Sequence, residues 1–142
     1  MIYLLDTNVV AEITTRPRPA PAVVAWARSV PAPALYLSVI TIAEIEAGIA
    51  VTHGPLRQAS FEQALEGIRD EYRDRIAAIG EREALAYLAV HRQLKSTGMS
   101  IDPPDALIAA TAIANGWTLV SRNIKHLART GALTLNPWEY QA

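Results

Sequence analysis

Short apolar runs alternate with longer segments along the chain. The apolar runs lie at residues 2–5, 35–38, 75–79, 118–120 and 133–135, and each is short enough to be a buried strand. The segments between them are longer and carry apolar residues at helical spacing. Strands that are apolar throughout are typical of a parallel sheet, because helices cover both of its faces. The pattern predicts an α/β fold, a three-layer α/β/α sandwich with a short parallel sheet.

Helices are expected between the strands, and proline and glycine mark several of their ends. Gly54, Gly98 and Gly116 each follow a helical segment, where glycine often ends a helix. Residues 14–21 carry three prolines and are expected to form an exposed connection. The expected helices are residues 9–13, 22–29, 40–52, 56–74, 81–97, 102–115 and 124–128.

The composition limits the organisation of the chain and its chemistry. The 142 residues, 51% of them hydrophobic, suit one compact domain over residues 1–142. The absence of cysteine excludes disulfides and thiolate-bound metals. The chain does not open with a basic and apolar leader, and no apolar run approaches membrane-spanning length. We therefore expect a soluble cytoplasmic protein with no membrane association.

The net charge of −1 gives no general attraction to nucleic acid. Binding of nucleic acid must then come from a local basic cluster or from a metal ion. One such cluster follows the fourth apolar run and consists of Arg122, Lys125, His126 and Arg129. These side chains are candidates for contact with a phosphate backbone, and their alternative role is that of a solvated surface helix.

Polar residues that follow apolar runs are the first candidates for chemistry, because parallel α/β sheets bind ligands at the carboxyl ends of their strands. Asp6 follows the run at 2–5 directly, Ser38 with Glu44 beyond it follows the second run, and the segment 121–123 follows the fourth. Asp6 has an alternative role of equal weight as the N-cap of the next helix, since Asp is a favoured capping residue.

Glu44 lies in a helical segment that is apolar on nearly every side and is therefore expected to be buried. Glu44 and Glu46 are about 200° apart on a helix of 3.6 residues per turn, so they cannot share a face. Glu44 shares its side with Thr41 and Gly48, which leave space beside it. We assign Glu46 to solvent, and a position on the flank of the helix that reaches water is also open for Glu44.

Asp105 stands in the first turn of a predicted helix that has Asp102 as its N-cap and Pro103 at its first position. The helix dipole favours an anion there. However, residues 106–114 are apolar on every side, so the helix is expected to be buried and to bring Asp105 inside. A buried carboxylate is costly unless it is paired or bound to a metal, and no basic residue lies within one helical turn.

The three acids Asp6, Glu44 and Asp105 are expected to converge at the strand ends. Like charges repel one another there unless a cation neutralises them. Mg²⁺ or Mn²⁺ suits such a site because hard cations prefer carboxylate oxygens. A metal-bound water is a nucleophile at neutral pH, so the residues point to hydrolysis of phosphate esters.

Five segments of the chain resemble the PIN-domain nucleases, and in particular the VapC toxins of bacterial toxin–antitoxin pairs, including their FitB-like subgroup. The matching segments are Leu4–Val9, Leu37–Glu44 with Gly48, Asp105–Ala112, Val120–Asn123 and Asn136–Trp138. The resemblance covers almost the whole chain. It implies a flavodoxin-like α/β/α sandwich, metal-dependent endoribonuclease activity on RNA, a homodimer and a cognate VapB-type antitoxin, in the bacterial cytoplasm.

The resemblance also implies roles for individual residues. Asp6, Glu44 and Asp105 correspond to the metal-holding acids of the family. Many relatives carry a fourth acid where this chain has the neutral Asn123, which puts a second metal ion in doubt. Ser121 takes the position of a Thr or Ser near the site, with strand-end capping as its alternative role. The residues expected to support the acids or to contact the substrate are Thr7, Asn8, Ser121, Arg122 and Asn123.

Two other functions stay open. A phosphohydrolase of small phosphate esters, as in haloacid-dehalogenase-like enzymes, also has an aspartate after its first strand. Its motif needs a second Asp two residues later, and this chain has Asn8 there. A catalytically weak PIN domain that serves as a binding module is the other alternative. The three retained acids count against it, whereas Asn123 keeps it open.

Overall fold

Five parallel strands form the centre of the molecule in a computed structural model that describes residues 1–142. The strands are β1 (Tyr3–Leu5), β2 (Leu35–Ser38), β3 (Ile76–Ala77), β4 (Thr118–Val120) and β5 (Leu133–Leu135). All five predicted strands are confirmed. The strand expected at 75–79 is shorter, because its partner β2 ends at Ser38, where the next helix begins.

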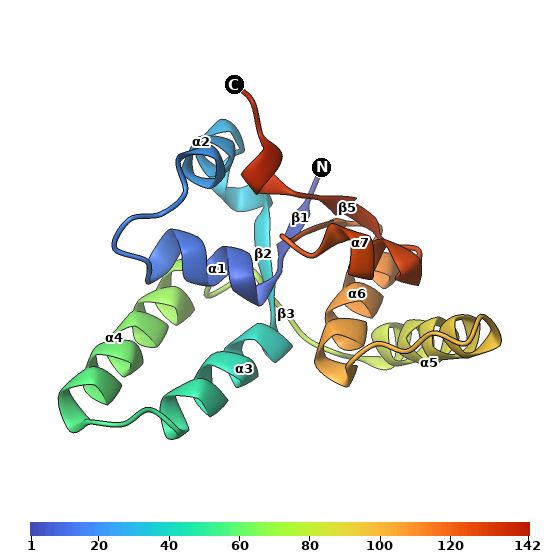
Figure 1. The fold of residues 1–142 in the computed structure, drawn as a ribbon, viewed down its shortest axis with the longest axis horizontal. Coiled ribbons are helices and arrows are strands. Elements are labelled where there is room, and N and C mark those ends of the chain that lie inside the picture. Colours follow the sequence, from blue (N-terminus) through green and yellow to red (C-terminus); the bar gives the residue numbers. More distant parts are fainter.

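Seven helices connect the strands, close to the predicted boundaries (Figure 1). The helices are α1 (Thr7–Thr14), α2 (Pro21–Ser29), α3 (Val39–Ala50), α4 (Pro55–Glu71), α5 (Glu81–Ser96), α6 (Pro103–Asn115) and α7 (Ile124–Leu127), and the 3-10 turns are η1 (Ala32–Ala34), η2 (Ala128–Thr130) and η3 (Pro137–Glu139). The prediction that the first helix begins at Val9 is wrong. Helix α1 begins at Thr7, because the Asp6 side chain accepts a hydrogen bond from the Thr7 amide and so caps the helix. No helix has the length and apolar character needed to cross a membrane.

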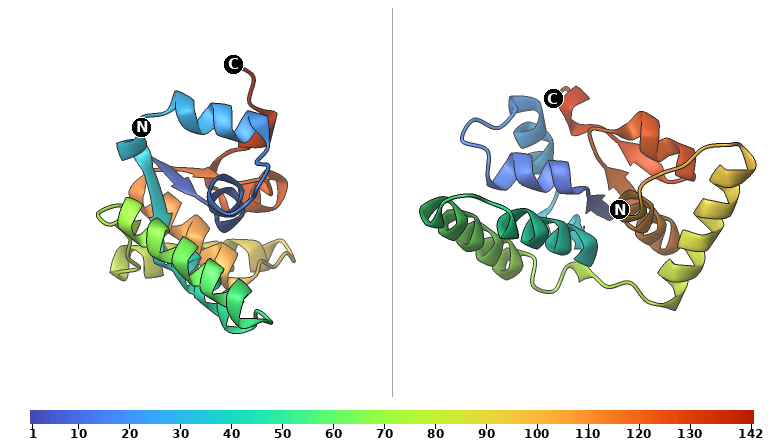
Figure 2. Two further views of the ribbon diagram at one scale, coloured as in Figure 1. Left: turned by 90° about the vertical axis from the view of Figure 1, so that its left-hand side faces the viewer. Right: turned by 60° about the horizontal axis from the view of Figure 1, so that its bottom comes forward.

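Two hydrophobic cores lie on opposite faces of the sheet. Side chains alternate between them along each strand, so that in β1 Leu5 belongs to one core and Leu4 to the other. Helices α1 to α4 contribute to the first core, and α5 to α7 contribute to the second. Figures 1 and 2 show the two groups of helices on either side of the strands. The predicted three-layer α/β/α sandwich is therefore confirmed.

The strand order is β3-β2-β1-β4-β5, so the chain reverses its direction across the sheet between β1 and β4. This order differs from the flavodoxin order 2-1-3-4-5 and matches the first five strands of the dinucleotide-binding sheets, 3-2-1-4-5. In both arrangements, ligands bind at the carboxyl ends of the strands beside the point of reversal. Leu5 of β1 is in register with Leu37 of β2 and Val120 of β4, so the three central strands end at one level.

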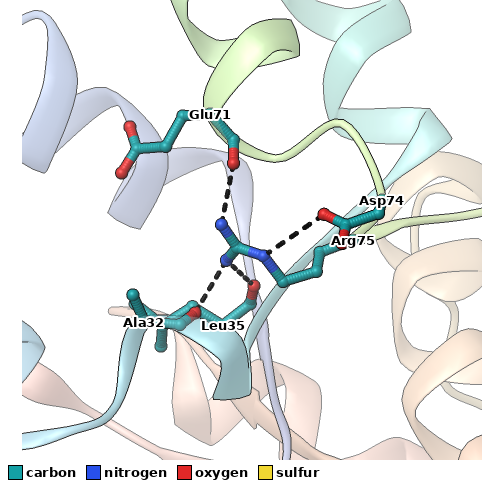
Figure 3. Close-up of polar contacts among 5 residues, drawn as sticks. All are labelled: Ala32, Leu35, Glu71, Asp74 and Arg75. Carbon is teal, nitrogen blue, oxygen red and sulfur yellow. Dashed lines mark hydrogen bonds and ion pairs between the residues drawn. The ribbon is translucent and has the colours of Figure 1, made fainter.

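The edge of the sheet at β3 is fixed by the Arg75 guanidinium (Figure 3). Its Nη1 donates to the carbonyl oxygens of Ala32 and Leu35, both at 2.7 Å, and its Nη2 donates to the Glu71 carbonyl at 2.7 Å. The contact with the exposed Asp74 carboxylate, at 3.8 Å, adds little because water screens it. Arg75 thus joins the end of α4 to the start of β2 and places β3 beside β2.

Candidate active site

Asp6 lies at the carboxyl end of β1 and is 5% exposed. Its Oδ1 accepts from the Thr7 amide at 2.8 Å, and its Oδ2 accepts from the Ser121 hydroxyl at 2.7 Å and from Asn8 Nδ2 at 3.4 Å. Burial raises the pKa of Asp6, and the hydrogen bonds from Ser121 and Thr7 oppose this shift. The N-cap role is therefore confirmed, but it uses only one carboxylate oxygen, and the other faces the end of β4.

Ser121 joins the ends of β1 and β4. Its hydroxyl donates to Asp6 and accepts from Asn8 Nδ2 at 3.2 Å and from the Asn123 amide at 3.1 Å. The last of these bonds closes the turn after β4, and the first holds the Asp6 carboxylate. The two alternative roles of Ser121, strand-end capping and a place beside the acids, are thus both present in the structure.

Glu44 is held by a chain of hydroxyl groups. The Thr7 hydroxyl donates to Glu44 Oε1 at 2.6 Å. Since Thr7 has a single hydroxyl proton and uses it for Glu44, the Thr41 hydroxyl 3.1 Å away must donate to Thr7. Glu44 therefore points toward the start of α1, beside Asp6, and is not simply a residue on the flank of its helix. Glu46 is exposed, as expected, and has only a solvated contact with Arg69 at 3.7 Å.

The prediction that the helix carrying Glu44 is buried on nearly every side is wrong. Only Thr41, Ile42 and Ile49 of α3 are buried. Apart from Val39 and Glu46, the exposed positions carry small residues, which expose little apolar surface to water. These small exposed residues are Ala43, Ala47, Gly48 and Ala50.

Asp105 stands in the first turn of α6 and is partly buried. The helix behind it is buried at Ala106 and at residues 108–112, but Ile113 is 38% exposed, so the prediction of burial on every side is only partly correct. Asp102 occupies the predicted N-cap position, but its side chain makes no capping hydrogen bond. The pKa of Asp105 is raised first by burial and then by the charges of Asp6 and Glu44, while His126 lowers it. The three predicted acids therefore lie in one region and feel one another's charge.

No basic side chain compensates these acids with an ion pair. The three ion pairs of the structure involve Glu46, Asp70 and Asp74 instead. The oxygen donors of the site match the preference of a hard divalent cation, and such a cation would offset the mutual repulsion. No three His, Asp or Glu side chains form a metal-binding group in this arrangement, so sharing an ion would require a side chain to turn, and Asp105 is the partly exposed acid that no hydrogen bond holds.

Comparison with known proteins agrees with this geometry. The PIN domain family model matches residues 3–133. The chain belongs to the PIN domain family. It is 34% identical over 139 residues to the VapC ribonuclease Y4jK of Sinorhizobium fredii, covering 97% of this chain and 99% of that protein. It is also 34% identical over 138 residues to the toxin FitB of Neisseria gonorrhoeae, covering 96% of this chain and 99% of that protein. The crystal structure of FitAcB from the same organism superposes with a TM-score of 0.89 at 33% identity, over 97% of this chain and 99% of that one.

Asn123, the neutral residue expected near the acids, is exposed, and its backbone amide donates to the Ser121 hydroxyl two residues earlier. Next to it, the Arg122 amide donates to Asn8 Oδ1 at 3.3 Å, and the Arg122 guanidinium lies over the Trp138 ring, 5.0 Å from its centroid. The sequence pattern gave no site role to Trp138, because its contact with Arg122 forms only when β5 returns the chain beside β4. Thr41 was noted only as a neighbour on the side of Glu44, and its hydroxyl contact was not predicted.

Proposed function

We propose that this PIN domain is a metal-dependent endoribonuclease that hydrolyses phosphodiester bonds in RNA and acts as the toxin of a VapBC-type toxin–antitoxin pair. One observation carries the nuclease assignment: Asp6, Glu44 and Asp105 lie together at the strand ends, and none of them forms an ion pair. The toxin assignment rests on relatives that match nearly the whole chain and are named ribonuclease and toxin.

The chain's residues have distinct tasks in this proposal. Asp6, Glu44 and Asp105 are the groups that would hold Mg²⁺ or Mn²⁺. When bound, such an ion makes a coordinated water more acidic and offsets the charge that develops on the phosphate. Ser121 fixes one oxygen of Asp6, and Thr7 fixes one oxygen of Glu44, so the carboxylates keep their directions without a protein cation.

The two alternative functions fit the site less well. The side-chain amide of Asn8 donates to Asp6 and to Ser121. Asn8, which supports Asp6, therefore occupies the position where a haloacid-dehalogenase-like phosphatase needs its second aspartate. A binding module does not need three acids that form no ion pair, because their mutual repulsion destabilises the site unless a cation is bound.

The nuclease assignment predicts which substrate the purified chain cleaves. After metal is stripped with EDTA, addition of Mg²⁺ or Mn²⁺ should restore cutting of an end-labelled single-stranded RNA, because the acids need a cation to act. The same samples should release no phosphate from a chromogenic phosphate monoester. Gel analysis of the RNA and absorbance of the monoester give the two readouts. Cutting that persists in EDTA, or turnover of the monoester instead of RNA, would contradict the proposal.

The toxin assignment predicts the effect of expression in a bacterial host. The chain expressed alone should arrest growth, and co-expression of the small protein encoded beside it should relieve the arrest. Growth curves at matched expression levels, with Asp105→Asn as the inactive control, measure this effect. Harmless expression of the unaltered chain would refute the toxin role and leave the nuclease role to the cleavage assay. The homodimer stays a prediction of the resemblance.

A further inference from the structure

A polar pocket lies beside the three acids, between the turn that follows β4 and the last 3-10 turn η3. Its volume is about 280 Å³. The residues that line it are Arg122, Asn123, Ile124, Lys125, His126, Asn136 and Glu139. Arg122 directly follows Ser121, which holds Asp6, and His126 is close enough to Asp105 to lower its pKa. The pocket therefore opens next to the acids, where a bound strand would continue.

The pocket contains cations that no acid of the chain neutralises. Arg122 and Lys125 are exposed and form no ion pair, and neither does Glu139 on the other wall. A chain with a net charge of −1 has no general attraction for a polyanion, so local unpaired cations of this kind decide where a polyanion can bind.

Arg122 is placed by two contacts before any ligand binds. Its backbone amide donates to Asn8 Oδ1, and its guanidinium lies over the Trp138 ring, 5.0 Å from the centroid. Trp138 is in turn fixed because its own amide donates to Asn136 Oδ1 at 2.9 Å. A guanidinium held over a ring by a cation–π contact still has N–H groups that can donate to the oxygens of a phosphate.

We propose that this pocket binds the phosphodiester group next to the one that is cleaved, with Arg122 as the main contact and Lys125 as a second. The proposal rests on the nuclease function above and names the substrate contact that such a nuclease needs. The Glu139 carboxylate on the opposite wall is an acceptor for base amino groups and does not take part in the phosphate contact.

Binding of RNA without cleavage tests the proposal. Fluorescence anisotropy with a labelled single-stranded RNA is measured on Asp105→Asn protein, which binds without cutting, alone and combined with Arg122→Ala. The added change should weaken binding about fivefold to tenfold, and the dependence of log K on log salt should become shallower by about 0.7 for one lost phosphate contact. In the active protein, Arg122→Ala should raise KM by a similar factor and leave kcat within about twofold.

Two matched variants complete the design. Arg73→Ala removes the same charge from an 80% exposed side chain beside β3, at the far edge of the sheet, and should leave RNA affinity unchanged. Arg122→Lys keeps the charge but not the planar guanidinium over Trp138, so it should keep the salt dependence and lose only part of the affinity.

The outcomes separate the two proposals. If the parent binds RNA and Arg122→Ala binds equally well, the pocket assignment is overturned and the nuclease proposal stands. Equal weakening by Arg73→Ala also overturns it, because charge in general would then explain the effect. Arg122→Lys as weak as Arg122→Ala overturns it too, because the retained positive charge would then contribute nothing to binding. If the parent binds no RNA and the unaltered chain cuts none, the nuclease proposal fails, and this one fails with it.

Discussion

Asp105→Asn is expected to lower the rate of metal-dependent RNA cleavage by more than about 100-fold, because the loss of a metal-holding acid should exceed the effect of losing a group that merely supports one. The same change should leave the melting temperature equal or higher. Burial and the charges of Asp6 and Glu44 already penalise the ionised Asp105 carboxylate, and a neutral amide of the same shape removes that repulsion. Steady-state cleavage rates and thermal melts of the same preparation measure the two effects.

The matched control for this prediction is Asp102→Asn. Asp102 is exposed, stands three residues earlier at the N-cap of the same helix, and makes no side-chain capping bond. The change therefore removes the same charge from the same element, and because Asp102 is the weakest of the influences on the Asp105 pKa, cleavage should stay near the unaltered level. Full activity of Asp105→Asn, or an equal loss in Asp102→Asn, would show that Asp105 does not have the proposed role.

The sheet and the meeting of the acids were predictable because they depend on local pattern and on the geometry of parallel strands. The run before Asp6 is apolar at every position, so it had to be a strand buried on both faces. Parallel strands end at one edge, which places Asp6 after β1 beside Ser121 after β4. Asp105 was predicted from the apolar helix that follows it, and most of this helix is buried in the structure, although Ile113 is exposed.

The contacts that orient the acids could not be predicted, since they join residues far apart in the sequence. Thr7 and Glu44 are 37 positions apart, and their hydrogen bond requires α1 and α3 to cross at the strand ends. The burial of α3 was overestimated because a helix that is apolar on nearly every side has the same sequence pattern whether one face or all faces are covered. The single domain over residues 1–142 and the assignment of the acids to a metal stay predictions.

The second large effect on cleavage is expected from removing the Thr7 hydroxyl. Thr7→Val keeps the shape of the side chain and removes the only hydrogen-bond donor that the structure gives to the Glu44 carboxylate, at 2.6 Å. We expect kcat to fall by about 10- to 100-fold, as for other groups that orient a metal-holding side chain, while KM for RNA changes little because Thr7 does not contact the pocket around Arg122. The free energy of unfolding should fall by about 1 to 3 kcal/mol, because two hydrogen bonds are lost and the buried Thr41 hydroxyl is left without its partner.

The conservative variant Thr7→Ser distinguishes orientation of Glu44 from a general loss of packing. Serine keeps the hydroxyl that donates to Glu44 and loses only a methyl group, so it should restore most of kcat, whereas a packing role would make it the worse of the two variants. The Mn²⁺ affinity, measured by calorimetry on the protein without RNA, should follow the same order, weak for Thr7→Val and nearly unaltered for Thr7→Ser.

The Thr41 hydroxyl explains why the effect should be this large. It donates to Thr7, so valine at position 7 breaks both bonds of the chain and frees Glu44 to turn toward water. If valine and serine at position 7 give equal kcat and equal Mn²⁺ affinity, Glu44 is not held in place through Thr7.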